Sequence, residues 1–171
     1  FALVLAVARK IPYLDSSTRN GEWVRSSGFE CLGKTICIVG LGSIGKVVAR
    51  CAQGFGMTVC AYDPYINADY CEEHQIESVS LEDGLKKADI ISLHLPLTDE
   101  TRHMIDEEAI KNMKDGAVVI NTSRGGIIDE DAAYEALKSG KLGGLGLDAF
   151  EMEPPKDSKL FEFDNVVATP H

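Results

Sequence analysis

Short apolar runs alternate with amphipathic segments along the chain from residue 35 onward. The runs read TICIVG, MTVCAYD, IISLHL, AVVINTS, GGLGLDAF and NVVAT, and they begin at Thr35, Met57, Ile90, Ala117, Gly143 and Asn165. They are apolar throughout and rich in β-branched residues, a pattern typical of parallel strands that are covered on both faces. The alternation therefore predicts an α/β fold, a doubly wound parallel sheet in three layers, α/β/α.

The amphipathic segments predict the helices that cover this sheet. After the first run, apolar side chains recur at helical spacing and predict a single apolar face made of Ile44, Val47, Val48, Cys51, Ala52 and Phe55. Residues 106–113 and 129–137 read as two further helices. The second of these begins with acidic residues and stops at Gly140, as helices commonly do.

The first 34 residues have a different organisation. Val4, Val7, Ala8 and Ile11 keep helical spacing back to the first residue, as if a helix had been entered partway, so the chain reads as an excised piece. Residues 12–33 are polar, contain glycine and show no period, which we interpret as a connecting arm. We therefore expect an interdomain helix and connecting arm over residues 1–34 and one α/β domain over residues 35–171.

Composition narrows the range of partners. The chain has 171 residues, 44% of them hydrophobic, and a net charge of −10, which disfavours nucleic acid and anionic membranes. The opening FALVLAVA is short and lacks a basic flank, so we expect neither a signal peptide nor an anchor. Five cysteines without a C-x-x-C pair fit a reducing, cytoplasmic setting, and Cys37, Cys51 and Cys60 read as small core residues.

A glycine-rich turn joins the first predicted strand to the first predicted helix of the sheet. Gly40, Gly42 and Gly45 form G-x-G-x-x-G in the context that a dinucleotide-binding fingerprint needs. The first glycine permits a tight turn, the second lets the backbone approach a pyrophosphate, and the third allows close packing of helix on strand. The anion should lie against the free amides of Ser43 and Ile44 at the helix start.

A lone glycine fingerprint is weak, but a carboxylate stands at the expected place. Asp63 ends the second predicted strand, about 20 residues after the glycine turn, where it can accept hydrogen bonds from the ribose hydroxyls. The same charge repels a 2′-phosphate, and Pro64 and Tyr65 follow it rather than an arginine. The sequence thus favours NAD over NADP, with a plain turn residue as the alternative role of Asp63.

Three chemically useful side chains follow later strands, where ligands bind in open α/β sheets. Arg124 offers a planar fork that matches a carboxylate with two parallel hydrogen bonds. His171 can exchange a proton with a carbonyl or hydroxyl oxygen, and Glu153 can orient its imidazole. Each residue alone could be an ordinary surface group, but their joint occurrence behind a nucleotide turn favours a catalytic set.

Other polar residues carry weaker predictions. Asp148 could bond the nicotinamide carboxamide or cap the following turn, and His94 could line the adenine or ribose site or be a packed loop residue. His74 and His103 lack a comparable setting and are expected to be solvated. No metal site is predicted.

Beyond these local features, the chain resembles the D-isomer-specific 2-hydroxyacid dehydrogenases over nearly its whole length. The matching motifs are GLGSIG, the YDP step, LHLPLTDETRHMI, NTSRGGIIDEDAAYEAL, GLDAFEMEPP and the terminal ATPH. The resemblance implies a Rossmann-type NAD-binding domain, and it assigns catalysis to Arg124, Glu153 and His171. It also implies cofactor contacts at Ser43, Ile44, Leu95, Pro96, Thr122, Ser123 and Asp148. Ser43 departs from the basic residue frequent there, which should weaken pyrophosphate binding slightly.

The resemblance also implies what lies beyond this chain. In the family, a second domain built from the two ends of the polypeptide closes over a small 2-hydroxy or 2-oxo acid, and that domain is missing here. Relatives pair through the helix and arm at the start of this domain, so we expect a homodimer that uses the apolar face of residues 1–11.

Within the family, a phosphoglycerate dehydrogenase is the first expectation, with glyoxylate, hydroxypyruvate and D-lactate types open. An NAD-sensing corepressor of the same fold is the alternative, and a formate dehydrogenase is disfavoured because that branch carries glutamine where this chain has Glu153.

Overall fold

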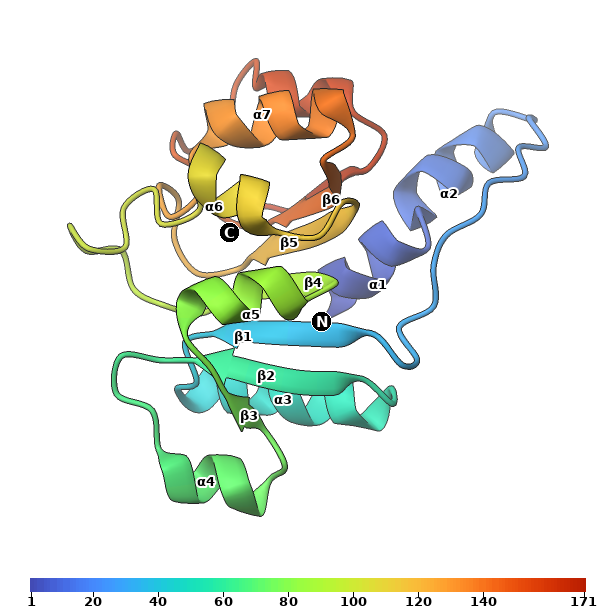
Figure 1. The fold of residues 1–171 in the computed structure, drawn as a ribbon. Coiled ribbons are helices and arrows are strands. Elements are labelled where there is room, and N and C mark those ends of the chain that lie inside the picture. The colour runs from blue at the N-terminus through green and yellow to red at the C-terminus, as the bar shows by residue number, and fades with distance from the viewer.

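Seven parallel strands form the centre of the structure, a computed structural model that describes residues 1–171 (Figure 1). The strands are β1 (Thr35–Val39), β2 (Thr58–Tyr62), β3 (Glu77–Ser78), β4 (Ile90–Leu93), β5 (Ala117–Asn121), β6 (Leu142–Leu147) and β7 (Val166–Ala168). Their order in the sheet is β3-β2-β1-β4-β5-β6-β7. The order reverses between β1 and β4, which opens a crevice at the carboxyl ends of these strands. The predicted doubly wound α/β fold is confirmed.

Helices cover both faces of this sheet. They are α1 (Ala2–Ala8), α2 (Ile11–Arg19), α3 (Ser43–Gly54), α4 (Ala68–Glu73), α5 (Leu81–Lys87), α6 (Glu107–Asn112) and α7 (Glu130–Ser139), with a 3-10 turn at Lys159–Glu162. Buried residues of α1, α3 and α4 belong to one hydrophobic cluster, and those of α5, α6 and α7 belong to a second cluster. The sheet is therefore the middle of three layers. No helix is both long and apolar enough to span a membrane.

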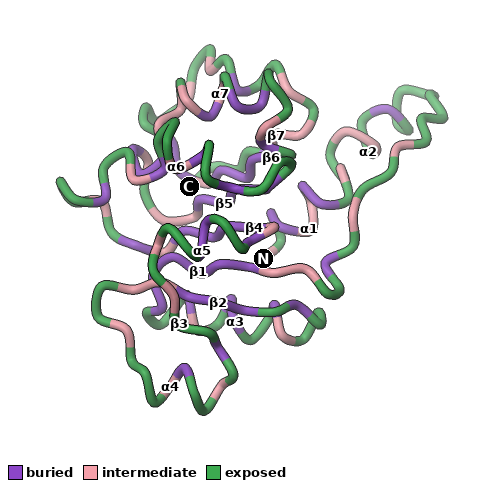
Figure 2. The backbone as a smooth tube through the Cα atoms, viewed as in Figure 1, coloured by how far each residue is buried: buried purple, intermediate pink, exposed green.

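The central strands are buried on both sides, as their apolar sequences indicate (Figure 2). In β1, Ile36 and Ile38 point into one hydrophobic cluster, whereas Cys37 and Val39 point into the other. Successive side chains of a strand alternate between faces, so a strand with two covered faces needs apolar residues at every position. Cys37 and Cys60 are fully buried, which confirms their predicted core positions.

Helix α3 turns a different face to the sheet than its apolar residues predict. Its buried residues are Gly45, Val48, Ala49 and Ala52. Ile44 is 67% exposed and Val47 and Phe55 are each 47% exposed, and Cys51 is exposed as well. Small side chains let the helix approach the strands closely, so they occupy the contact and leave the larger apolar ones outside. The predicted core position of Cys51 is wrong for this reason.

The expected structureless arm contains a helix. Helix α1 ends at Ala8, Lys10 adopts a left-handed backbone, and α2 begins at Ile11 with Pro12 in its first turn. Proline fits that position because its missing N–H would have no partner there. Only Ser17 is buried in α2, so most of this helix lies on the surface.

The apolar face of α1 packs on the chain's own sheet. Leu3, Val4, Val7 and Ala8 are buried, and a side chain on Gly144 of β6 would lie 2.4 Å from Val7 Cγ1. The glycines of β6 thus create the room that α1 fills. This face is not free for another subunit, so the predicted use of residues 1–11 as a dimer surface is wrong on this point.

The segment between Asp63 and Asp89 also holds elements that the sequence pattern did not predict. It forms α4, the two-residue strand β3 and α5. The side chains of Asn67 and Ser80 cap the two helices by accepting hydrogen bonds from backbone N–H groups. These elements are too short to show a clear hydrophobic period.

Strand β4 is followed by a partly buried histidine, His94, at the carboxyl edge of the sheet. Nε2 of His94 lies 2.9 Å from Ser92 Oγ, so its partner is a side chain rather than the backbone. Burial lowers the pKa of His94 from 6.5 to about 4. The imidazole is therefore neutral in the folded protein near neutral pH.

This burial predicts a pH dependence of stability. The unfolded chain binds a proton at His94 near pH 6.5 and the folded chain only near pH 4, so the stability from the neutral imidazole is complete above pH 6.5 and is lost as the pH falls toward 4. We expect the free energy of unfolding of His94→Gln to fall less over this window, by up to about 3 kcal/mol. Urea denaturation of both proteins at several pH values measures the difference, and equal slopes would contradict it.

Candidate functional site

The glycine turn after β1 is built on close backbone contacts. Gly40 has a φ of 101°, and a side chain there would lie 2.8 Å from the carbonyl of His94. A side chain on Gly45 would lie 2.1 Å from the carbonyl oxygen of Gly40. By contrast, the space beside Gly42 is open, and no side chain caps the start of α3. The turn thus leaves helix-start amides open to an anion, as the fingerprint predicts.

Asp63 ties the end of β2 to this turn. Its Oδ2 accepts a hydrogen bond from the Leu41 N–H at 2.7 Å, and its Oδ1 accepts one from the Tyr65 N–H at 2.8 Å. Each carboxylate oxygen keeps a free lone pair. The side chain is therefore held in place with acceptor capacity left for the two hydroxyls of a ribose.

The residues expected to flank a cofactor lie on the neighbouring loops. Leu95 is buried, and its Cδ2 approaches the position of a Gly40 side chain at 3.1 Å. The Pro96 carbonyl accepts a hydrogen bond from Thr101 Oγ1 at 2.7 Å. Thr122 and Ser123 follow β5, which pairs with β4. The loop after β4 and the loop after β5 therefore lie side by side at the carboxyl edge of the sheet.

The loop after β5 is organised by Asn121, which the sequence analysis did not single out. Asn121 is almost fully buried, and its Nδ2 donates to the carbonyl of Arg124 at 2.8 Å. Its Oδ1 accepts from the N–H and the hydroxyl of Ser123 at 3.0 and 2.9 Å. A buried amide with every contact inside one loop holds that loop in one conformation. The sequence signal for Asn121 was a polar residue at the end of the otherwise apolar run AVVIN.

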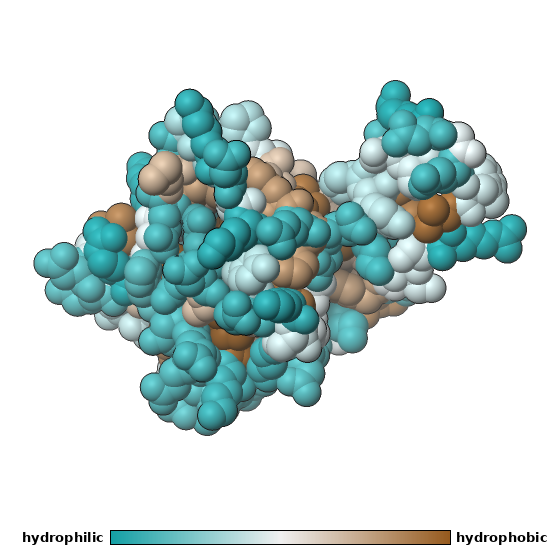
Figure 3. All heavy atoms as spheres, turned by 90° about the horizontal axis from the view of Figure 1, so that it is seen from above, coloured by the Kyte–Doolittle hydropathy of each residue, from teal (hydrophilic) through white to brown (hydrophobic).

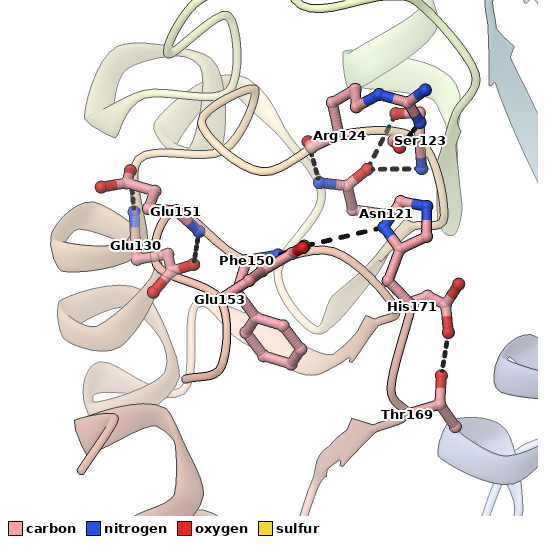
Figure 4. Close-up of polar contacts among 10 residues, drawn as sticks. Asn121, Ser123, Arg124, Glu130, Phe150, Glu151, Glu153, Thr169 and His171 are labelled. Atoms are coloured by element: carbon pink, nitrogen blue, oxygen red, sulfur yellow. Dashed lines mark hydrogen bonds and ion pairs between the residues drawn. The ribbon is translucent and has the colours of Figure 1, made fainter. Parts of the chain in front are cut away.

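The three predicted catalytic residues meet around one cavity (Figure 4). Glu153 Oε1 lies 3.6 Å from His171 Nδ1 and accepts a hydrogen bond from the Phe150 N–H at 3.2 Å. The guanidinium of Arg124 donates to the Ser123 carbonyl at 2.7 Å. The cavity has a volume of about 490 Å³ and is lined by Leu97, Arg124, Gly125, Phe150, Glu151, Glu153 and His171. The structure thus brings together three side chains that are widely separated in sequence.

The arrangement of these groups suits proton transfer beside a bound anion. Because Nδ1 of His171 faces the Glu153 carboxylate, Nε2 is left without a partner in the chain. A carboxylate beside Nδ1 orients the ring and leaves Nε2 facing outward. Arg124 is the only arginine that lines the cavity, and it is accompanied by two carboxylates, Glu151 and Glu153.

Asp148, which follows β6, is held by Thr169, two residues before His171. Thr169 Oγ1 donates to Asp148 Oδ1 at 2.5 Å, and the Asp148 N–H donates to the Asn121 carbonyl at 2.9 Å. The carboxylate therefore bonds across to the next strand rather than capping its own turn. Thr169 is a further site residue that the sequence analysis missed, and only the β6–β7 pairing brings it here.

The two histidines expected to be solvated both have partners. His74 Nδ1 lies 3.0 Å from the Tyr70 carbonyl oxygen, and the two rings stack at 3.9 Å. His103 Nε2 lies 2.9 Å from Glu151 Oε1, beside the cavity. The His103 side chain is nevertheless 43% exposed, as predicted, whereas the His74 side chain is partly buried at 31% exposed. No group of three or more His, Cys, Asp or Glu side chains could hold a metal ion.

Comparison with known proteins gives a consistent result. The family model "D-isomer specific 2-hydroxyacid dehydrogenase, NAD binding domain" matches residues 1–171. The chain is 49% identical to D-3-phosphoglycerate dehydrogenase of Methanocaldococcus jannaschii over 99% of its length and 33% of the relative. It is also 49% identical to hydroxypyruvate reductase of Thermotoga maritima, over 99% of its length and 56% of the relative.

Solved structures show the same similarity. The D-lactate dehydrogenase from Aquifex aeolicus, complexed with NAD and lactic acid, superposes with a TM-score of 0.91 at 37% identity, covering 100% of this chain and 57% of the other. The chain thus spans between a third and just over half of the length of these relatives. It belongs to the D-isomer-specific 2-hydroxyacid dehydrogenase family, as an NAD-binding domain.

Proposed function

We propose that this chain binds NAD and supplies the acid–base residues of a D-2-hydroxyacid dehydrogenase. The observation that carries the proposal is the single cavity at the carboxyl edge that Arg124, Glu153 and His171 share. NAD supplies the hydride acceptor or donor, and the substrate is a small acid oxidised or reduced at C2. The rest of the protein closes the other side of the cleft, as the partial coverage of the relatives suggests.

Each catalytic residue then has one task. Arg124 binds the substrate carboxylate through two parallel hydrogen bonds, which places C2 in the cavity. His171 donates a proton from Nε2 to the carbonyl oxygen during reduction, and accepts it from the hydroxyl during oxidation. Glu153 orients the imidazole.

We assign the cofactor to the crevice beside the glycine turn. The amides of Ser43 and Ile44 at the start of α3 donate hydrogen bonds to the pyrophosphate, and Asp63 accepts hydrogen bonds from the ribose hydroxyls. Gly40, Gly42 and Gly45 provide the close backbone approach. Asp148 contacts the nicotinamide end of the cofactor. The part of the site between the nicotinamide and the pyrophosphate is lined by Leu95, Pro96, Thr122 and Ser123.

Phosphoglycerate dehydrogenase activity is the first candidate among the substrate types. The Methanocaldococcus jannaschii relative carries that name, but an equally identical relative is a hydroxypyruvate reductase. Such mixed names indicate that the substrate side chain is read mainly by the part of the cleft that this chain does not provide. Glyoxylate reductase, hydroxypyruvate reductase and D-lactate dehydrogenase activities are therefore tested as well.

We further propose a cytoplasmic location. All five cysteines are free, and four of them are buried. Buried thiols without disulfide partners fit a reducing compartment.

A substitution at Asp63 tests the cofactor site. We expect Asp63→Ala to weaken NADH binding by roughly 10- to 100-fold, because hydrogen bonds to a charged group contribute about 1.5–3 kcal/mol. Fluorescence titration of NADH measures the affinity. Asp69→Ala, which removes an exposed carboxylate on α4, is the matched control and should bind as the unmodified protein does. Equal affinities of the two variants would count against the assignment.

Turnover by the full-length protein tests the reaction. NADH oxidation is followed with phosphohydroxypyruvate, hydroxypyruvate, glyoxylate and pyruvate. We expect turnover of one of these acids, and a loss of about 10²- to 10⁴-fold in His171→Ala because its proton donor is gone. Arg124→Ala and Arg124→Lys should both raise KM, whereas Arg50→Ala on the outer side of α3 should not. Tight NADH binding without turnover would instead favour the NAD-sensing corepressor.

We also propose that the protein is a homodimer. Helix α2 and the arm that follows it extend from the body at the edge opposite the cavity, and Figure 3 shows them as a separate lobe with a small hydrophobic patch. Trp23 is 82% exposed and Leu32 is 70% exposed. Apolar side chains this exposed are typical of a surface that a second subunit covers.

The oligomeric state tests this proposal. We expect light scattering of the full-length protein to give twice the chain mass, and Trp23→Glu to shift the population toward monomer because it places a charge in the apolar contact. A monomer at high concentration in the unmodified protein would contradict the proposal.

A further inference from the structure

The turn that carries Glu153 presents two carboxylates in different directions. We call residues 150–153 the Glu153 turn. Glu153 Oε1 faces His171 Nδ1 at 3.6 Å, whereas Glu151 Oε1 faces His103 Nε2 at 2.9 Å. Both glutamates line the same cavity. One contact belongs to the proposed proton transfer, and the other has no role in it.

His103 is itself fixed by the structure around it. It follows β4, and its N–H donates to the Gly126 carbonyl at 2.8 Å. Its φ is 50°, a left-handed backbone that non-glycine residues adopt rarely and that the neighbouring contacts must maintain. Two residues later, Ile105 forms a parallel bridge with Ile128. His103 is thus a rigid point that contacts the loops after both β5 and β6.

A second contact holds the Glu153 turn from the side of α7. Oε1 of Glu130 accepts a hydrogen bond from the Glu151 N–H at 2.8 Å, and the Glu130 N–H in turn donates to Glu151 Oε1 at 3.5 Å (Figure 4). Underneath, a side chain on Gly125 would lie 1.7 Å from the Phe150 carbonyl oxygen, so the turn rests directly on the loop of Arg124. Glu151 is therefore held at two points. Its backbone N–H bonds to Glu130 of α7, and its carboxylate contacts His103.

We propose that His103 is a positioning residue for the acid–base pair, and that its contact with Glu151 keeps the Glu153 turn where the Glu153 carboxylate faces His171. The connection is short, because the Phe150 N–H that binds Glu153 belongs to the residue next to Glu151. The catalytic consequence rests on the proposed dehydrogenase function, whereas the effect on the turn does not.

The exposure of the His103–Glu151 pair allows a positioning role to be distinguished from a contribution to folding stability. The His103 and Glu151 side chains are 43% and 39% exposed, and ion pairs this exposed contribute little to folding stability. Loss of the contact should therefore leave Tm almost unchanged. Its effect should appear in kcat, because a small displacement of a catalytic group lowers the rate strongly.

Two variants of His103 that differ by one methylene group test the proposal in the full-length protein. Asparagine tolerates the left-handed backbone but is too short to reach Glu151. His103→Asn should lower kcat about tenfold, with KM for NADH and Tm unchanged. His103→Gln places an amide N–H near the position of Nε2 and should restore most of kcat. His74→Asn, on the remote helix α4, is the matched control and should keep full activity.

A substitution of the partner tests whether the two side chains act together. Glu151→Ala should lower kcat as His103→Asn does, and the double variant should be no worse than either single one. Additive losses would show that the two residues act separately, which would overturn the proposal. A fall in kcat that His103→Gln does not restore, together with a lower Tm, would assign His103 a purely structural role.

Hydrogen exchange gives a readout that needs no turnover. In His103→Asn, amides of residues 149–153 should exchange faster, while those of β1 and β4 stay as in the unmodified protein. If the unmodified protein oxidises NADH with none of the acids, the proposed function fails. The exchange data still show whether the His103–Glu151 contact holds the Glu153 turn in place. Unchanged exchange in the Glu153 turn would overturn the proposal.

Discussion

The structure depends on one constraint, that the central strands are covered on both faces. Ile36 and Ile38 fill one side of β1, and Cys37 and Val39 fill the other, so polar side chains are rare within these strands. Parallel strands also end at the same edge. The side chains that follow the carboxyl ends of several strands therefore come together, and the nucleotide turn and the acid–base cavity both lie there.

Those loops support one another through contacts that only glycine or a buried amide allows. Gly45 lets α3 approach the Gly40 carbonyl, and Gly125 lets the Glu153 turn rest on the Arg124 loop. Asn121 closes the Arg124 loop from inside with three hydrogen bonds. Together these contacts turn separate connections into one rigid edge, which is what catalysis and cofactor binding require.

Much of this arrangement could be predicted because its signals are local. A strand covered on both faces shows a continuous apolar run, and a phosphate turn shows its glycines at set spacing. The positions of Arg124, Glu153 and His171 after strands could also be predicted, as parallel strands bring such residues to one edge. Helix α2 could not, because its residues are mostly polar and only Ser17 is buried.

By itself, then, the sequence determined the fold class, the nucleotide turn and the family, since each is encoded by residues within short windows. Only the tertiary structure decided which face of α3 is buried, that α1 covers β6, and that His103 and Thr169 belong to the site. Those features depend on distances between segments that are far apart in the chain. Side-chain size, strand order and the close approach of backbones determine such distances, and no local pattern records them.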